Sequence, residues 1–199
     1  MSTTVAWHQL HEPSDIADAV IGLILDKGQT RYDESVTQVE HALQCGAHAL
    51  SAGADDAVVL AAFLHDIGHL LLDEHDEKGN FLDTDLRHEN VGSRFLANWF
   101  DDAVTGPIEL HVPAKRYLCG TDPDYAARLS ASSIRSLEVQ GGAMTDVEIA
   151  GFERRPHHEA AVAVRRWDDD AKVEGVACPN IEDFRYRMIH YLERSGGAR

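Results

Sequence analysis

Residues 55–69 read DDAVVLAAFLHDIGH, an apolar run that ends in the polar motif HDIGH. The apolar residues recur with helical spacing, so we expect a buried helix that carries His65 and Asp66 into the interior. An imidazole next to a carboxylate offers a metal one neutral and one anionic ligand, and a carboxylate can bridge two ions. A buried aspartate without a partner is costly, whereas cations make it tolerable. We therefore predict that Asp66 bridges two metal ions.

The chain of 199 residues fits one domain, residues 1–199, with a substantial core. Met1 to His11 lacks a basic segment followed by an apolar run, and no stretch approaches the roughly 20 apolar residues of a membrane span. The three cysteines are widely spaced and form no CxxC pattern, which suits a reducing compartment. We expect a soluble, cytoplasmic monomer or homodimer with no membrane partner.

The formal net charge is -16 with histidine counted as neutral. Binding of nucleic acid depends on clustered lysine and arginine, so this charge argues against a nucleic-acid partner. An anionic small molecule can still bind where a local group of cations overcomes the general field. The charge therefore argues against nucleic acid and leaves an anionic small-molecule partner possible.

Apolar residues recur at three- and four-residue spacing almost throughout, and strand-like alternation is nearly absent. This pattern predicts an all-α fold, a helical bundle with the dinuclear site in its core. We expect helices at residues 13–27, 35–52, 55–73, 88–100, 107–118, 122–139, 145–153, 157–171 and 181–194. Residues 74–87 are polar and contain glycine, which predicts a loop over or beside the site.

Local signals support several of these helices. Asp122 and Pro123 suit an N-cap and a first helical residue, and Gly141–Gly142 suits the end of that helix. Thr145 can form a capping box with the glutamate three residues later. Pro107 suits a helix start, but Pro113 lacks a backbone donor and predicts a kink or an early end.

Four histidines and two aspartates stand on separate predicted helices in the order H, HD, H, H, D. They are His41, His65, Asp66, His88, His111 and Asp168. Helix bundles assemble metal sites in this way, with one or two inward side chains from each helix. A single histidine is usually structural, but the ordered set indicates one metal centre. We expect these histidines not to be ligands: His8, His11, His48, His75, His157, His158 and His190.

These residues resemble the HD-domain superfamily, whose name comes from the doublet seen here as His65-Asp66. Most members are metal-dependent phosphohydrolases, and a smaller branch consists of mixed-valent diiron oxygenases. The chain is most similar to the phosphonate-cleaving, PhnZ-like members of that branch. The similarity covers most of the chain and runs through HALQC at 41–45, LAAFLHDIGH at 60–69, HVPAKRYLCG at 111–120, QGGAM at 140–144 and RRWDDDAK at 165–172.

The resemblance implies two iron ions, Fe(II) and Fe(III), with O2 as co-substrate. One iron would be held by His41, His65, Asp66 and Asp168, and the other by His88, His111 and the bridging Asp66. The family ligand is the first acidic residue after a tryptophan, here Trp167, which selects Asp168 over Asp169 and Asp170. Ligand type disfavours magnesium, but spacing alone does not distinguish iron from manganese, zinc or cobalt.

The resemblance also implies substrate contacts. His69 is similar to the anion-binding histidine of the phosphonate branch, and Lys115 can point a positive charge into the same site. With Asp66, these two are the predicted catalytic residues. Hydroxyl and amide donors for the phosphonate oxygens are expected from Ser133, Ser136 and Gln140.

The segment TRYDES at 30–35 carries the predicted contact to the other end of the substrate. Tyr32 resembles a tyrosine that occupies an iron position until substrate arrives, and Glu34 resembles a carboxylate that meets the substrate's amine. One residue fewer separates the two than in the family pattern. Asp33 can therefore share or replace the role of Glu34.

The implied reaction is cleavage by O2 of the carbon-phosphorus bond of 1-hydroxy-2-aminoethylphosphonate or its N-trimethylated analogue, giving phosphate and glycine or glycine betaine. A metal-dependent phosphohydrolase of nucleotides or other phosphoesters would use nearly the same ligands. His69 and the segments HVPAKRY and WDDDAK argue against that alternative. A noncatalytic binding module is the second alternative, although such modules often lack ligands that are present here.

Overall fold

The computed structural model describes residues 5–31, 35–72 and 86–196, and every regular element in these ranges is helical, which confirms the predicted all-α fold. The elements are η1 (Trp7–Gln9), α1 (Pro13–Lys27), α2 (Gln38–Ser51), α3 (Asp56–Leu64), α4 (Ile67–Leu71), α5 (His88–Leu96), α6 (Asp102–Thr121), α7 (Pro123–Ala126), α8 (Ala131–Val139), α9 (Asp146–Phe152), α10 (His158–Asp170) and α11 (Ile181–Arg194). Within the described ranges, no helix has the length and apolar character needed to cross a bilayer.

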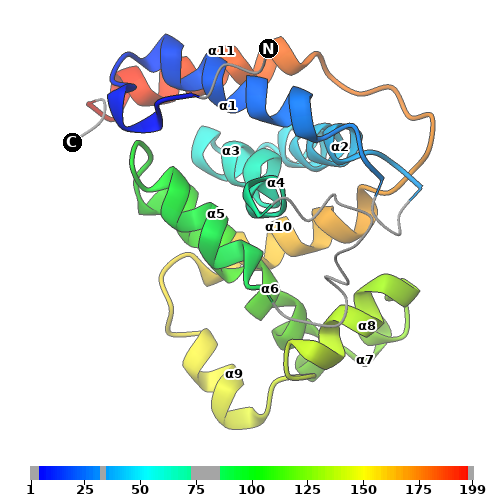
Figure 1. The fold of residues 1–199 in the computed structure, drawn as a ribbon. Coiled ribbons are helices and arrows are strands. Elements are labelled where there is room, and N and C mark those ends of the chain that lie inside the picture. Colours follow the sequence, from blue (N-terminus) through cyan, green and yellow to red (C-terminus); the bar gives the residue numbers. More distant parts are fainter. Residues whose placement is uncertain (1–4, 32–34, 73–85, 197–199) are drawn as a thin grey trace.

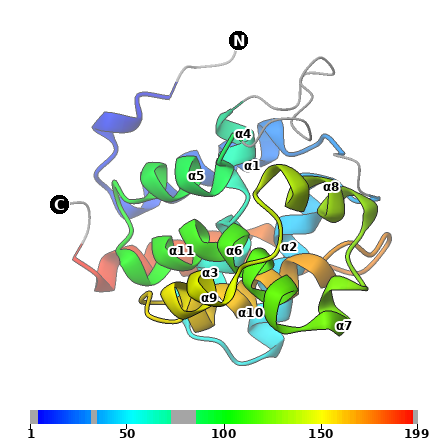
Figure 2. The same cartoon turned by 90° about the horizontal axis from the view of Figure 1, so that it is seen from below.

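Helix α3 lies at the centre of the bundle, where it contacts α2, α6, α10 and α11. Figure 1 shows α1 and α11 side by side on one face, with α5, α6 and α10 beyond the layer of α2, α3 and α4. Helices α7, α8 and α9 lie at the end farthest from α1 and α11. Seen from below, α6 and α10 cross in front of α3 (Figure 2).

The sequence of α3 explains its central position. Asp55 caps the helix, since its carboxylate accepts a hydrogen bond from the Val58 amide at 3.0 Å. A helix surrounded by other helices needs apolar side chains in every direction, and most of α3 is buried. The buried residues are Ala57, Val59, Leu60, Ala61, Ala62, Phe63 and Leu64. Each fully buried Val, Leu or Phe contributes roughly 1.5–3 kcal/mol.

The predicted continuous helix at 55–73 is wrong, because the chain turns at the His-Asp doublet. Helix α3 ends at Leu64 and α4 begins at Ile67, and Asp66 between them has φ -96° and ψ 7°. This backbone conformation lies outside the helical region and recurs at active sites. The His65 ring donates from Nδ1 to the Ala62 carbonyl at 2.9 Å, which satisfies one carbonyl at the end of α3. The turn brings both doublet side chains to one site.

Helix α6 is longer than the predicted 107–118, so Pro107 does not start it and Pro113 does not end it early. It begins at Asp102, after Asp101 accepts a hydrogen bond from the Ala103 amide, and it continues past Pro107 and Pro113 to Thr121. The lost donor of Pro113 costs on the order of 1 kcal/mol. The buried face of α6, packed against α3, α5 and α10, offsets that loss.

The predicted helix at 122–139 divides into α7 and α8. Asp122 and Pro123 start α7 as predicted, but Ser130 begins a new helix by accepting from the Ser133 amide at 3.2 Å. The capping box at Thr145 is confirmed. Gly141 and its neighbour adopt positive φ angles of 99° and 73° after α8 ends, as a glycine stop requires.

Phe184 fixes α11 to the centre of the bundle. Its fully buried ring stacks on Phe63 with centroids 4.4 Å apart. On the other side, a Cβ added to Gly46 of α2 would lie 2.3 Å from the Phe184 ring, so only glycine allows this approach. One aromatic ring therefore holds α11 against both α2 and α3.

We predict that Phe184→Ala lowers the free energy of unfolding by about 3–5 kcal/mol, because it leaves a cavity beside Phe63. Chemical denaturation measures this change. Tyr186→Ala on the same helix is the matched control, since Tyr186 is 57% exposed and its loss should change stability by less than about 0.5 kcal/mol. Equal effects of the two variants would contradict the role of Phe184.

Candidate metal centre

The structure brings all six predicted ligands together from distant parts of the chain. Helices α2, α5, α6 and α10 contribute one residue each, and the doublet comes from the end of α3 and the turn after it. Most of these side chains are buried, as expected for ligands of a metal site in the core of the bundle. The set is His41, His65, Asp66, His88, His111 and Asp168.

The histidines form two pairs with Asp66 between them. His41 Nε2 lies 3.3 Å from His65 Nε2, and His88 Nε2 lies 3.1 Å from His111 Nε2. Asp66 Oδ2 is 3.6 Å from His41 Nε2, while its Oδ1 is 3.5 Å from His88 Nε2. Oδ1 also lies 3.4 Å from His65 Nε2, so the Asp66 carboxylate stands between the two pairs, within reach of both, as a bridging ligand would.

Backbone carbonyls determine which ring nitrogens face inward. Nδ1 of His41 lies 2.9 Å from the Ala171 oxygen, and Nδ1 of His111 lies 2.7 Å from the Ile108 oxygen. Nδ1 of His65 likewise faces a backbone carbonyl, that of Ala62 in α3. A carbonyl only accepts, so each Nδ1 carries the proton and, in a neutral ring, Nε2 presents a lone pair. Such lone pairs 3.1–3.3 Å apart repel unless a cation lies between them. The residues therefore fit a pair of metal ions, for which this ring arrangement is typical.

The charges within the cluster support the same interpretation. Burial would raise the pKa of Asp66, but His65, His88 and His69 hold it well below its usual value. Burial lowers the pKa of His41, yet Cys45 and Asp168 raise it well above the ordinary range. A second proton on His41 can supply positive charge beside the carboxylates, and a metal ion would take the place of that proton when bound.

Among the three acidic residues after Trp167, Asp168 is the one that faces the histidines. Its Oδ1 lies 3.4 Å from His41 Nε2. Asp169 instead pairs with Arg165 and Tyr125, and Asp170 is exposed. The choice of Asp168 as a ligand stays a prediction, but the alternatives point elsewhere.

Two neighbours of the ligands were not predicted. Arg165 contacts Asp168 Oδ2 through NH1 at 2.5 Å, and the spacing of three residues on one helix was the available signal. Cys45 lies one turn after His41, with Sγ 3.7 Å from His41 Nε2. Burial raises the pKa of the Cys45 thiol, and the neighbouring His41 partly opposes that rise.

Gly68 of HDIGH sets the distance between α4 and α5. A Cβ at this position would lie 1.9 Å from the His88 carbonyl oxygen and 3.0 Å from the His88 Cα. The His69 ring stacks on the His88 ring with centroids 3.7 Å apart. Helix α4 therefore holds His88 in place through both its backbone and a ring.

The predicted anion-binding residues are only partly brought together. Lys115 is buried and donates to Ser136 Oγ at 2.7 Å, and Ser136 donates to the Ser133 carbonyl at 3.1 Å. Gln140 Oε1 is buried and accepts no hydrogen bond from the described residues. His69 lies on the metal side, with Nε2 3.9 Å from Asp66 Oδ1. Tyr32, Asp33 and Glu34, like the predicted loop up to residue 85, lie outside the described residues.

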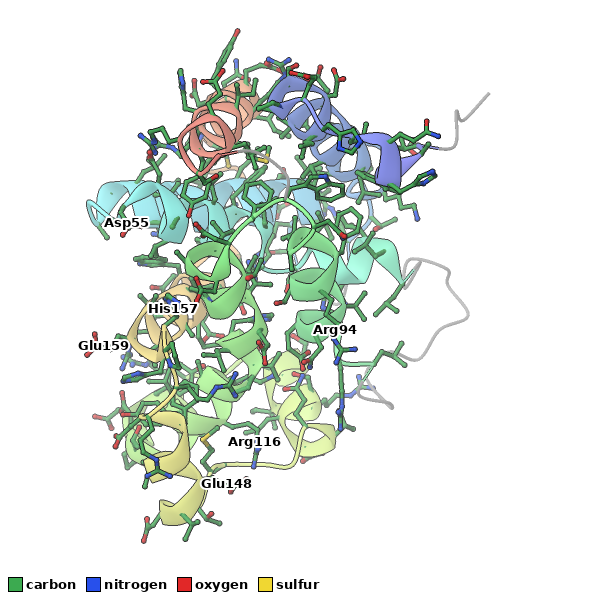
Figure 3. All side chains as sticks on the ribbon, turned by 90° about the vertical axis from the view of Figure 1, so that its left-hand side faces the viewer. Asp55, Arg94, Arg116, Glu148, His157 and Glu159 are labelled. Carbon is green, nitrogen blue, oxygen red and sulfur yellow. The ribbon has the colours of Figure 1, made fainter. Side chains whose placement is uncertain are left out.

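Arg116 fixes the segment that follows Gln140. Its Nε donates to the Gly142 carbonyl at 2.8 Å, and NH2 pairs with Glu148 Oε1 at 2.7 Å. Figure 3 shows Arg116 and Glu148 close together at the end of the molecule formed by α8 and α9. This link holds the end of α8 against α6, next to Lys115.

Comparison with known proteins agrees with this geometry. The HD domain model matches residues 39–131. A hydroxymethylphosphonate dioxygenase from Gimesia maris is 51% identical over 92% of this chain and 91% of its own length. The chain belongs to the HD-domain family. A [1-hydroxy-2-(trimethylamino)ethyl]phosphonate dioxygenase (glycine-betaine-forming) from Leisingera caerulea is 36% identical over 92% of the chain and 94% of its own length. The chain is thus an oxygenase of the PhnZ-like branch, as the motifs indicated.

We predict that Gly68→Ala displaces His88 and costs about 1–3 kcal/mol of stability, because the added methyl group meets backbone atoms. One of the two predicted metal ions should be lost or bound far more weakly. Metal content after reconstitution, measured by elemental analysis, and thermal unfolding test this.

Gly22→Ala is the matched control. Gly22 lies in α1 with no atom within 4 Å of an added Cβ, so alanine should stabilise that helix by roughly 0.5–1 kcal/mol. Metal content should not change. A Gly68→Ala protein with the wild-type metal content would show that the close approach to His88 is dispensable.

Proposed function

We propose that this oxygenase uses two iron ions and O2 to break the carbon-phosphorus bond of a small 1-hydroxyalkylphosphonate. The observation that carries the proposal is the placement of Asp66 between two pairs of inward-facing imidazoles. His41, His65, Asp66 and Asp168 would hold one ion, and His88 and His111 with Asp66 the other. When bound, the pair supplies redox chemistry with O2, which none of these side chains can supply alone.

The reaction balances with O2 as the sole oxidant. A 1-hydroxyalkylphosphonate and O2 give a carboxylate, phosphate and a proton. In the net reaction the carbon loses a C–H and a C–P bond and gains one oxygen atom, phosphorus gains the other oxygen atom, and O2 accepts the four electrons that the carbon loses. No external reductant is needed, so the protein's task is to bind and orient the substrate and to exclude water.

Lys115 supports the anionic end of the proposed substrate. It is a buried cation whose hydrogen-bond partner is a neutral hydroxyl, on Ser136, so its charge can balance an entering phosphonate. Ser136 orients the ammonium group. Gln140 Oε1 lacks a donor among the described residues, and a substrate hydroxyl would provide one. A buried polar atom without a partner costs free energy that substrate binding would recover.

Three substrates merit direct comparison: hydroxymethylphosphonate, 1-hydroxy-2-aminoethylphosphonate and its N-trimethylated analogue. The sequence favours the second and third, but Tyr32 and Glu34 are one residue closer together than the family pattern for amine binding. Hydroxymethylphosphonate has no amine, and the 51% identical relative is named for it. We therefore rank hydroxymethylphosphonate first.

The decisive experiment measures O2 uptake and phosphate release by iron-loaded protein with each of the three compounds. We expect one phosphate per O2, with formate as the second product from hydroxymethylphosphonate. The same assay without O2 distinguishes the phosphohydrolase alternative, because hydrolysis needs no oxidant. Phosphate released at an equal rate under anaerobic conditions would refute the oxygenase mechanism for these substrates.

Lys115 also predicts a pH dependence. Burial, together with the nearby Arg165, lowers the pKa of Lys115 to about 7. Its charged form, which binds the dianion, is present below that pKa and is lost as the pH rises through it. We expect kcat/KM to fall above pH 7 by up to about tenfold per unit.

Lys115→Arg is the matched variant, because arginine stays charged throughout this range. Its profile should be flat above pH 7 even though its maximal rate is lower. The substrate's own titration is the same for both proteins. Parallel profiles would assign the pH dependence to another group.

A further inference from the structure

A buried network joins α7 to the candidate ligand Asp168. Arg165 of α10 uses NH1 for Asp168 and its other edge for Asp169, whose Oδ2 lies 3.0 Å from Arg165 Nε. Tyr125 of α7 donates its hydroxyl to the same Asp169 oxygen at 2.6 Å and accepts from Arg165 Nε at 3.1 Å. One guanidinium therefore serves two carboxylates and one hydroxyl.

Arg165 fixes the orientation of the Asp168 carboxylate at the metal centre. NH1 holds Oδ2, which lies 3.8 Å from His65 Nε2, while Oδ1 lies 3.4 Å from His41 Nε2. A guanidinium is planar and rigid, which means that the direction of NH1 depends on where Nε and NH2 are held. Both of those atoms are held by Asp169, so the geometry of Asp168 depends on a partner outside the metal centre.

Tyr125 completes the anchor. It is 4% exposed, and burial raises the pKa of its hydroxyl, so the hydroxyl keeps its proton and donates to Asp169. Because Tyr125 belongs to another helix, its hydrogen bonds restrict the side chains of Arg165 and Asp169, which could otherwise shift together as a pair. Arg166 of α10 also lies over the Tyr125 ring at 5.9 Å, and its exposed ion pair with Asp122 at 3.4 Å contributes little.

We infer that Tyr125 and Asp169 are positioning residues that set the metal affinity of the ion held by His41, His65 and Asp168, acting through Arg165. This inference rests on the proposed diiron function. Partners one step beyond the ligands typically change metal affinity 10- to 100-fold when removed. Tyr125 contacts the ligand only through Arg165, so we expect its removal to lower metal affinity by about tenfold, the lower end of that range.

The test compares Tyr125→Phe with Tyr117→Phe. Each variant loses one hydroxyl that donates to a carboxylate, but the Tyr117 hydroxyl bonds Glu153 at 3.1 Å, away from the metal centre. Iron affinity is measured by chelator competition, and the thermal unfolding of both apoproteins is recorded. We expect Tyr125→Phe to bind one of two ions about tenfold more weakly, while Tyr117→Phe binds both as the wild type does.

Three outcomes would overturn the inference: wild-type affinity for both ions in Tyr125→Phe, the same loss in Tyr117→Phe, or an affinity loss matched by an equal weakening of both ions. A wild-type protein that binds no iron would refute the proposed function itself, and the inference with it. If Tyr125→Phe does not fold, Asp169→Asn gives the same test, because the amide keeps an acceptor for Arg165 but loses the charge. Asp169→Asn should again lower the affinity for one of the two ions only.

Discussion

The arrangement depends on one electrostatic constraint: carboxylates and imidazole lone pairs held close together in a largely buried site need positive charge among them. Asp66 and Asp168 are surrounded by four inward-facing Nε2 atoms, and three of the rings are fixed by carbonyls of the backbone. Without cations, such a cluster would be a severe cost to the fold. Helix α3 has to be apolar on every face to carry His65 into this environment. The packing of the core and the geometry of the site therefore depend on the same helix.

Much of the fold could be predicted from the sequence, because the local rules agree with the tertiary structure. The boundaries of α1 and α11 follow from their apolar periodicity and match the prediction at every residue. The errors occur where tertiary packing outweighs a local signal. The break at Asp66 comes directly after an apolar run, and the one glycine nearby, Gly68, lies inside α4 and does not mark it. Pro113 carries a strong helix-stop signal, but the packing of α6 against three helices overrides it.

The site, too, has a part that the sequence predicts and a part that it does not. The histidines and aspartates that face the centre form an ordered pattern that can be recognised along the chain. The residues that support them are found through contacts between distant segments, such as Tyr125 with Asp169, 44 positions apart. A buried arginine looks like a surface residue in a polar stretch such as RRWDDD until its partners are known. Sequence patterns therefore indicate ligands more readily than the groups that hold the ligands.

Charge distribution explains how a protein of net charge -16 can bind a dianion. Arg165 cannot serve that purpose, since Asp168 and Asp169 already balance it. Lys115 differs, because its hydrogen-bond partner is the uncharged Ser136. Burial disfavours the charged form of Lys115 when its partner is only a hydroxyl, and the lowered pKa of Lys115 reflects this cost. An entering phosphonate would remove that penalty, so binding the substrate and stabilising the site are the same event.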